Sequence, residues 1–213
     1  MWERGVLEDS GIPHPGTALD YLLGTYVRDP EVLSACIEIL LRFGGKSKYE
    51  FPAILAVVRG RIAEVAALLD ENPDLLHQRF PGLDFGTTAG RMLTLRGGTL
   101  LHVAVEFQNI DAVQLLLDRG ADVNAPAMVD EAGTGGQTPI FHAATQTGDA
   151  GLPVVQLLVE RGANLRVRAK VAGHYEAPGE VMECTPLEYA LRFPGDQGPT
   201  AVYLKTHVVS VGF

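Results

Sequence analysis

A short pattern recurs along this chain, in which a helix begins after a threonine and the helix pair ends at a glycine. The two clearest copies begin at Thr99-Leu100-Leu101-His102 and at Thr138-Pro139-Ile140-Phe141-His142. They end at Gly120-Ala121-Asp122 and at Gly162-Ala163-Asn164, each after a leucine-rich run. Because such a module repeats at a spacing of tens of residues, it predicts a stack of similar units.

Each residue of this pattern has a physical reason to be there. The hydroxyl of Thr99 or Thr138 can accept a hydrogen bond from an unpaired N–H at the start of a helix. Pro139 is tolerated at the first helical position, where a missing N–H costs nothing. Gly120 and Gly162 follow apolar runs with helical spacing, where a left-handed residue is needed to end the helix.

Three further units fit the same template less closely. One begins at Thr17, one at Phe51-Pro52, and one at Thr185-Pro186. Asn72 is expected to end the second unit in the left-handed conformation that asparagine tolerates. The last unit has no Gly-Ala ending. The approximate units are residues 16–47, 48–76, 97–125, 136–165 and 184–207.

These segments resemble the repeats of the ankyrin family, whose opening is Thr-Pro-Leu-His-x-Ala. The resemblance implies an all-α, right-handed ankyrin-repeat solenoid of about five helix-turn-helix units, forming a single domain over residues 1–213. It also implies a non-catalytic protein-protein interaction module, whose partner lies in a concave groove. In the family the motif histidine, here His102, bonds backbone groups of adjacent units. His142 lies one residue later than the equivalent position.

Three insertions lengthen the junctions between units beyond the family period of about 33 residues. They span residues 77–96, 126–136 and 166–183, and the resemblance implies that all three emerge on one edge. Long surface loops cost little closure entropy, so they need not be functional. However, the first and third insertions contain arginine and bulky apolar residues, and Arg166 to Ala172 alternates as a strand does. Both are interpreted as extended β-hairpin-like fingers, and the middle insertion as a flexible turn.

The first and third fingers are the expected binding elements, because arginine and aromatic residues are enriched in interface hot spots. In the alternative interpretation, Phe80, Phe85, Leu93 and Leu95 pack the first finger onto its neighbours. If the fingers bind a partner, the expected ligand is a protein segment with acidic or aromatic residues, because arginine suits carboxylates and aromatic faces. The candidate partner-binding residues are Phe80, Arg91, Arg96, Arg168, His174 and Tyr175.

Composition narrows the class of partner. The chain has 17 basic and 26 acidic residues, a net charge of −9, which disfavours nucleic acid. No apolar run is long enough to span a membrane. Cys36 and Cys184 do not suggest a disulfide framework, so a cytoplasmic location is the simplest expectation. The protein is also expected to be a monomer. Cys36 is expected to be buried on its helix.

Catalytic patterns are incomplete in this sequence. Gly44-Gly45-Lys46-Ser47 lacks the earlier glycine of a phosphate-binding loop and is interpreted as a helix end. No histidine or cysteine pair has metal-ligand spacing, and no cofactor is expected. The alternative function is a small-ligand-binding or metal-dependent enzyme site between the long fingers. In that case His102, His142 and His174 would converge.

The pattern also predicts a core and leaves the ends open. The segment from Val208 to Phe213 is apolar and rich in β-formers, and three roles are open: an extended cap, a dimer contact or a truncated repeat. The residues expected to be buried between units are Ala104, Val113, Leu115, Leu116, Ala143, Ala144, Val154, Leu157 and Leu158.

Overall fold

The computed structural model describes residues 17–24, 29–49, 51–83, 85, 92–173, 177, 179–193 and 198–210. Helices dominate this part of the chain. The α-helices are α2 (Ala18–Leu23), α3 (Pro30–Arg42), α4 (Pro52–Val58), α5 (Ile62–Glu71), α6 (Leu100–Glu106), α7 (Ile110–Asp118), α8 (Pro139–Ala144), α9 (Leu152–Glu160), α10 (Pro186–Arg192) and α11 (Pro199–Ser210). Two short 3-10 helices, Pro73–Leu76 and Thr147–Asp149, and two strands, β1 (Ala169–Ala172) and β2 (Val181–Cys184), complete it.

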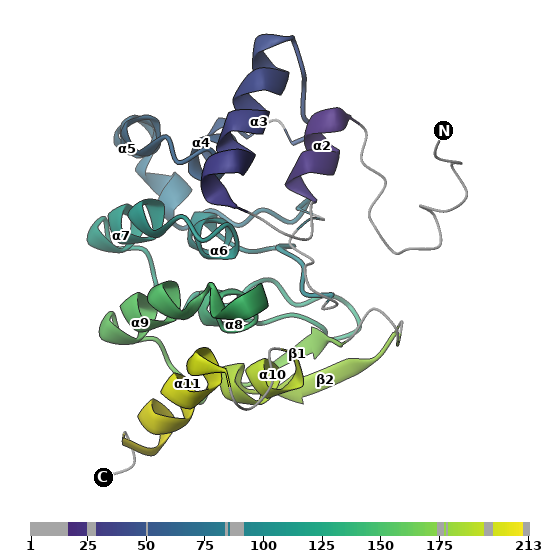
Figure 1. Ribbon diagram of the computed structural model, residues 1–213, viewed down its shortest axis with the longest axis vertical. Helices are drawn as coiled ribbons and strands as arrows, with labels where there is room; N and C mark the ends of the chain where they lie inside the picture. Colours follow the sequence, from purple (N-terminus) through teal and green to yellow (C-terminus); the bar gives the residue numbers. More distant parts are fainter. Residues whose placement is uncertain are drawn as a thin grey trace.

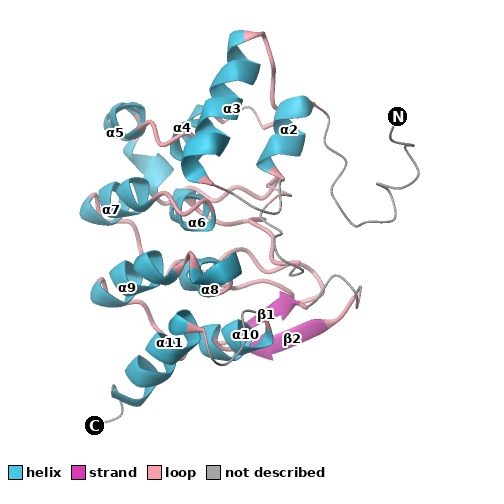
Figure 2. Ribbon diagram, in the orientation of Figure 1, coloured by secondary structure: helices cyan, strands magenta, loops and turns pink. Residues whose placement is uncertain are grey.

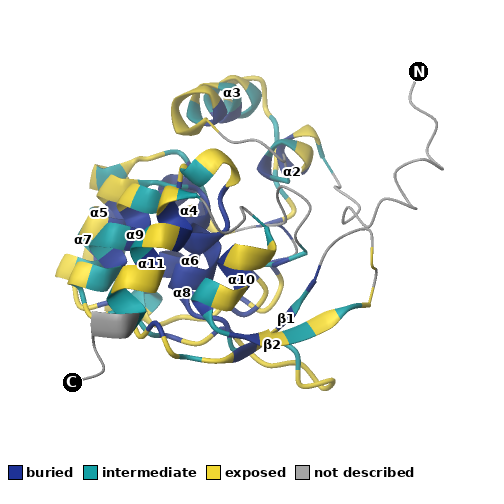
Figure 3. Ribbon diagram, turned by 60° about the horizontal axis from the view of Figure 1, so that its bottom comes forward, coloured by how far each residue is buried: buried dark blue, intermediate teal, exposed yellow. Residues whose placement is uncertain are grey.

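Consecutive helices pack as pairs, and the pairs stack on one another (Figure 1). The inner helices α4, α6, α8 and α10 form one column, and the outer helices α5, α7, α9 and α11 form a second column beside it. The inner helices α4, α6 and α8 are the most deeply buried part of the stack (Figure 3). Stacking is required because no single pair can bury its apolar face alone.

Helix starts follow the local signals with one exception. The hydroxyl of Thr17 accepts from the Asp20 N–H, and that of Thr185 accepts from the Glu188 N–H. Pro139 and Pro186 occupy the first turns of α8 and α10. Thr138 lies at the cap of α8, but its buried hydroxyl has no hydrogen-bond partner among the described residues. The Phe141 N–H bonds to the Thr138 carbonyl instead.

Helix ends depend on glycine in the left-handed region. Gly120 and Gly162 have φ of 93° and 86°, and the N–H groups of Ala121 and Ala163 close the last turns of α7 and α9. Gly44 also has a positive φ, 81°, at the end of α3. The Gly44-Gly45 segment is therefore a helix end, as predicted.

The predicted left-handed ending at Asn72 is wrong. Asn72 has φ −139° and ψ 87°, an extended conformation, and the 3-10 helix Pro73–Leu76 follows directly. The physical reason is Pro73, because the ring of a proline restricts the preceding residue to extended conformations.

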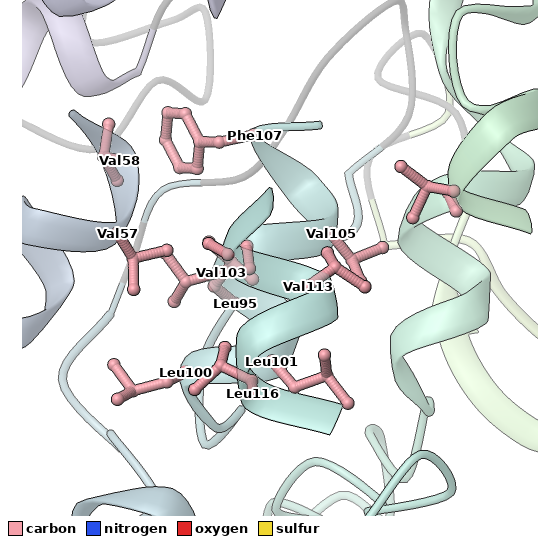
Figure 4. Packing of buried hydrophobic residues seen from close by; sticks show 14 of the residues in the cluster. Val57, Val58, Leu95, Leu100, Leu101, Val103, Val105, Phe107, Val113 and Leu116 are labelled. Atoms are coloured by element: carbon pink, nitrogen blue, oxygen red, sulfur yellow. The ribbon is translucent and has the colours of Figure 1, made fainter. Parts of the chain in front are cut away.

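The core runs along the inner column. Every residue of α6 is buried, which is expected for a helix with neighbours on several sides. Val57 of α4, Val103 of α6 and Val113 of α7 belong to one apolar cluster that extends across these helices (Figure 4).

Two predicted core residues and one cysteine are less buried than expected. Leu115 and Leu157 are only half-buried, because they lie on flanks of the outer helices α7 and α9. Cys36 is also half-buried, because no further described unit covers the outer side of α3.

The three insertions leave the stack on the side of the inner helices, away from the outer column (Figure 2). We call them the first, middle and third long loops, residues 77–96, 126–136 and 166–183. In the third long loop β1 and β2 pair antiparallel, from Ala169 opposite Cys184 to Ala172 opposite Val181. The middle long loop turns back on itself, and Val129 and Gly135 form an antiparallel bridge across it.

The end of the chain is helical as far as the structure describes it. Val208 lies in α11, and its carbonyl accepts a hydrogen bond from the Arg166 guanidinium. An extended cap is therefore excluded for residues 208–210, which are helical, while residues 211–213 lie outside the described residues. Packing of α11 against α9 and α10 outweighs the weak strand preference of valine.

Candidate interaction site between the long loops

Backbone hydrogen bonds connect the three long loops to one another. The Met128 N–H donates to the carbonyl of Gly97, which adjoins the first loop, at 3.1 Å, and the Gly135 N–H donates to the Lys170 carbonyl at 2.7 Å. The Met92 N–H donates to the Gly173 carbonyl at 3.1 Å, which joins the first loop directly to the third. Side by side in this way, the loops form one layer beside the inner helices.

The first long loop contributes to the core of the protein. Phe80 is 1% exposed, and Phe85, Leu93 and Leu95 are buried as well. The ring of Phe80 packs edge-on against Phe51, with centroids 5.2 Å apart. Phe80 is therefore not available to a partner. The interpretation in which these four side chains pack the loop onto its neighbours is confirmed.

A cavity of about 540 Å³ lies where the three loops meet. This volume falls within the range of about 300–1,000 Å³ that is typical of ligand pockets. Its wall includes Met92, Thr94 and Arg96 from the first loop, Met128, Thr134 and the adjoining Gln137 from the middle loop, and Val171 and Ala172 from the third. All three loops therefore contribute to the wall of the cavity.

Gln137 supplies the wall with a buried amide. Its side-chain Nε2 donates to the Thr94 carbonyl at 3.1 Å, which orients the amide group. The residue is 4% exposed, and its Oε1 has no hydrogen-bond partner among the described residues. A buried acceptor without a partner costs about 1–3 kcal/mol. This oxygen is buried within the wall and is not open to the cavity.

The predicted arginines have different surroundings. Arg96 is exposed and lines the cavity. Arg168 is held within the third loop, because its guanidinium contacts the Glu188 carboxylate at 3.2 Å and donates to the Glu183 carbonyl at 2.7 Å. Arg91, His174 and Tyr175 lie outside the described residues. Of the six candidates, Arg96 is the one that the described structure places at the cavity with its side chain exposed.

Sequence reasoning missed the exposed residues of the middle loop. Met128 and Val129 are 46% and 58% exposed and both line the cavity. The available signal was a pair of apolar residues within an otherwise small and acidic loop. Its glycine content was instead interpreted as flexibility.

His102 links two units. Its Nδ1 accepts from the Thr99 N–H at 3.0 Å, so Nε2 carries the proton that it donates to the Gln137 carbonyl at 3.1 Å. Burial, and then the nearby His142, lower the pKa of His102 to about 3, so the ring is neutral. These bonds correspond to the role that the family resemblance implies.

His142 is fully buried with Glu106. The His142 Nδ1 lies 2.7 Å from the Glu106 Oε2, and both side chains are 0% exposed. The rings of His102 and His142 stand edge-on at 5.8 Å. Neither histidine is part of the cavity wall. The described residues include no group of three or more potential metal ligands.

The fold and its repeated signals agree with the comparison to known families. Residues 31–127 and 86–169 match the family described as ankyrin repeats (3 copies). These overlapping segments cover more than half of the chain. The chain therefore belongs to the ankyrin-repeat family, as its opening and closing motifs predicted.

A relative extends the comparison over part of the chain. The B-cell lymphoma 3 protein homolog of Mus musculus is 32% identical over 109 residues, which is 51% of this chain. The match covers 22% of the relative, so the chain corresponds to a small part of that protein. In the part of the chain that the structure describes, every helix is too short or too polar to cross a membrane.

Proposed function

We propose that this chain is a non-catalytic protein-protein interaction module that binds a protein partner along the edge formed by its long loops. The observation that carries the proposal is the layer formed by the three long loops, because it presents an exposed arginine and two exposed apolar residues beside a cavity. Arginine and methionine are enriched in interfaces, and buried anchors in pockets dominate binding energy. Membership of the ankyrin-repeat family supports the same general role.

The charges on the edge and on the whole chain favour some classes of partner over others. Arg96 is exposed at the cavity, and its fixed fork of donors suits a carboxylate or an aromatic face. The net charge of −9 argues against a phosphate backbone as the partner. A protein segment with aromatic or acidic residues is the expected ligand. A cytoplasmic location and a monomeric state stay predictions, and light scattering checks the second.

Point substitutions on the edge test this proposal. Removing residues 77–96 is unsuitable, because the deletion would also remove buried core residues such as Phe80 and Leu95. The double variant Arg96→Glu with Met128→Asp changes exposed groups only. We expect it to lose a partner captured by the intact chain from an extract of the source organism, with binding at least about tenfold weaker.

The matched control is Arg42→Glu, which reverses an exposed charge at the end of α3, away from the loops. It should retain the partner. The unfolding midpoint of each variant, measured by circular dichroism, shows that the folded state is kept. Equal capture by the double variant and the intact chain would show that the loop edge is not the binding surface.

A further inference from the structure

An apolar groove lies between α2 and α3, the first helix pair of the stack (Figure 1). Its volume is about 540 Å³. The residues of its wall are Ala18, Tyr21 and Leu22 from α2 and Cys36, Ile39 and Leu40 from α3. None of these side chains is charged at neutral pH, so the groove suits an apolar occupant.

The groove continues into an exposed apolar stripe along α3. Val32, Cys36, Ile39 and Phe43 follow one another every three or four residues, which places them on one face of the helix and its cap. Val32, Ile39 and Phe43 are each more than half exposed. Folded proteins rarely leave apolar surface of this kind uncovered unless something binds there.

We infer that residues 1–16 of this chain fold back over the groove and insert the side chain of Trp2 into it. These residues lie outside the described residues, and the chain passes from them through Thr17 to Ala18, which is part of the groove wall. The occupant is thus joined directly to its site. The inference is separate from the proposed function, because no residue of this groove belongs to the long loops.

The length and composition of residues 1–16 support this placement. Sixteen extended residues reach about 50 Å, whereas α3, with 13 residues, is only about 20 Å long. The segment can therefore reverse direction and still follow the stripe. Its large apolar residues are Trp2, Val6, Leu7 and Ile12. Burial of the indole alone should favour the covered groove at least about tenfold.

The attached segment is favoured over a second copy of the chain as the occupant. A short tether gives the segment an effective concentration in the millimolar range, without the entropy loss of joining two molecules. A stable dimer buries about 800 Å² on each partner. Here only one apolar face of two helices, with 6 and 13 residues, is offered.

Fluorescence tests the inference in the full chain, because Trp2 is its single tryptophan. We expect Trp2 to emit at a shorter wavelength than in urea. Ile39→Asp introduces a charge into the groove and should shift the emission back to the wavelength seen in urea. The matched control is Ile110→Asp, which changes another exposed isoleucine, on α7, and should leave the emission unchanged.

Circular dichroism shows whether both variants keep their helices. Emission of the folded intact chain at the wavelength seen in urea would overturn the inference. The same emission from both folded variants would also overturn it, since the groove would then have no effect on Trp2.

The thiol of Cys36 gives a second measurement that leaves α3 unaltered. Trp2→Ser in the full chain should make Cys36 react with a thiol reagent at least about tenfold faster. The buried Cys184 is the internal control. Equal rates at Cys36 in the two proteins would overturn the inference. Protection of Cys36 that increases with protein concentration would overturn it too, because it would assign the groove to a second copy.

Discussion

Buried polar side chains connect neighbouring units in ways that apolar packing cannot. His102 joins α6 to the chain just before α8 through the Gln137 carbonyl, and His142 of α8 contacts Glu106 of α6. Gln146 adds donor bonds to the carbonyls of Glu106 and His142. Because such bonds have defined geometry, they align α6 and α8 in one register, whereas apolar contacts alone tolerate small shifts.

The lowered pKa of His102 makes stability depend on pH. Below about pH 6.5 the unfolded chain protonates this residue, while the folded chain keeps it neutral down to about pH 3. The free energy of unfolding should therefore decrease as the pH falls through this window, by up to about 1.4 kcal/mol per pH unit from this group. Urea unfolding of the intact chain between about pH 6 and pH 5 measures the slope.

The control for this prediction is His102→Gln, which cannot titrate. It is expected to be less stable at every pH, because it loses the bonds to Thr99 and Gln137. The free energy of unfolding of this variant should change less steeply with pH than that of the intact chain. The difference between the two slopes should approach the contribution of one bound proton, about 1.4 kcal/mol per pH unit. Identical slopes for the two proteins would mean that His102 is protonated equally in the folded and unfolded states.

Among the helices, the outer column is connected differently from the inner one. Arg119 contacts Asp70 at 2.6 Å, and Arg161 contacts Asp118 at 2.8 Å, so each arginine reaches the preceding outer helix. These ion pairs are substantially exposed, and such pairs typically contribute about 0.2–1 kcal/mol. Buried leucines therefore supply more of the cohesion between α5, α7 and α9 than the charges do.

Two neighbouring leucines of α7 test this comparison. Leu116 is fully buried and Leu115 is half-buried, although the two residues are chemically identical. Leu116→Ala should lower the free energy of unfolding by roughly 2–5 kcal/mol, and Leu115→Ala by about 1 kcal/mol. Chemical denaturation measures both values. Equal losses would contradict the inner and outer faces assigned to α7.

The consequence of Leu116→Ala should extend beyond its own helix. Because α7 packs against both α5 and α9, the loss weakens two interfaces of the stack. Amide hydrogen exchange should therefore accelerate in α5 and α9 as well as in α7. Faster exchange in α7 alone would indicate that the units are stabilised independently.

In the molecule as a whole, the stack and the loop layer depend on each other. The stack brings the three insertions to the same side, and their backbone bonds then close the cavity. Gly135 is central to this layer, because it bridges to both Val129 and Lys170. Its φ of 130° and its closeness to the Met128 carbonyl leave no space for a side chain.

Gly135→Ala should separate the middle loop from its neighbours without dissolving the helices. A Cβ at this position would collide with the Met128 backbone, so the bond from Gly135 to Lys170 should break. We expect faster hydrogen exchange at Gly135 and altered methyl signals of Met128, with unchanged helical circular dichroism. The matched control is Gly133→Ala, where φ is also positive at 76° but the added Cβ meets only the end of the Lys170 side chain, at 4.0 Å.

The control should show the cost of a left-handed alanine, about 1–2 kcal/mol, without loss of the loop contacts. If both alanine variants behave alike, the close approach of Gly135 and Met128 does not hold the loops together.

The helix boundaries and the family could be predicted from the sequence, whereas most residues of the cavity wall could not. Thr185 with Glu188 and Ala121 with Leu116 are contacts between residues near each other in the chain, so local patterns indicate them. The left-handed ending predicted at Asn72 is wrong because Pro73 restricts the residue before it to extended conformations. The sequence left the role of the segment from Val208 open, because the β-forming composition and the packing of α11 favour different conformations.

Local signals acting over a few residues thus specify where helices begin and end, and their recurrence specifies a stack. The direction in which Phe80 points, the exposure of Met128 and the isolation of Gln137 Oε1 depend on contacts between loops that are distant in the chain. Such contacts are set by the register of neighbouring units, which no single segment encodes. For that reason the proposed binding edge becomes visible only once the units are packed together.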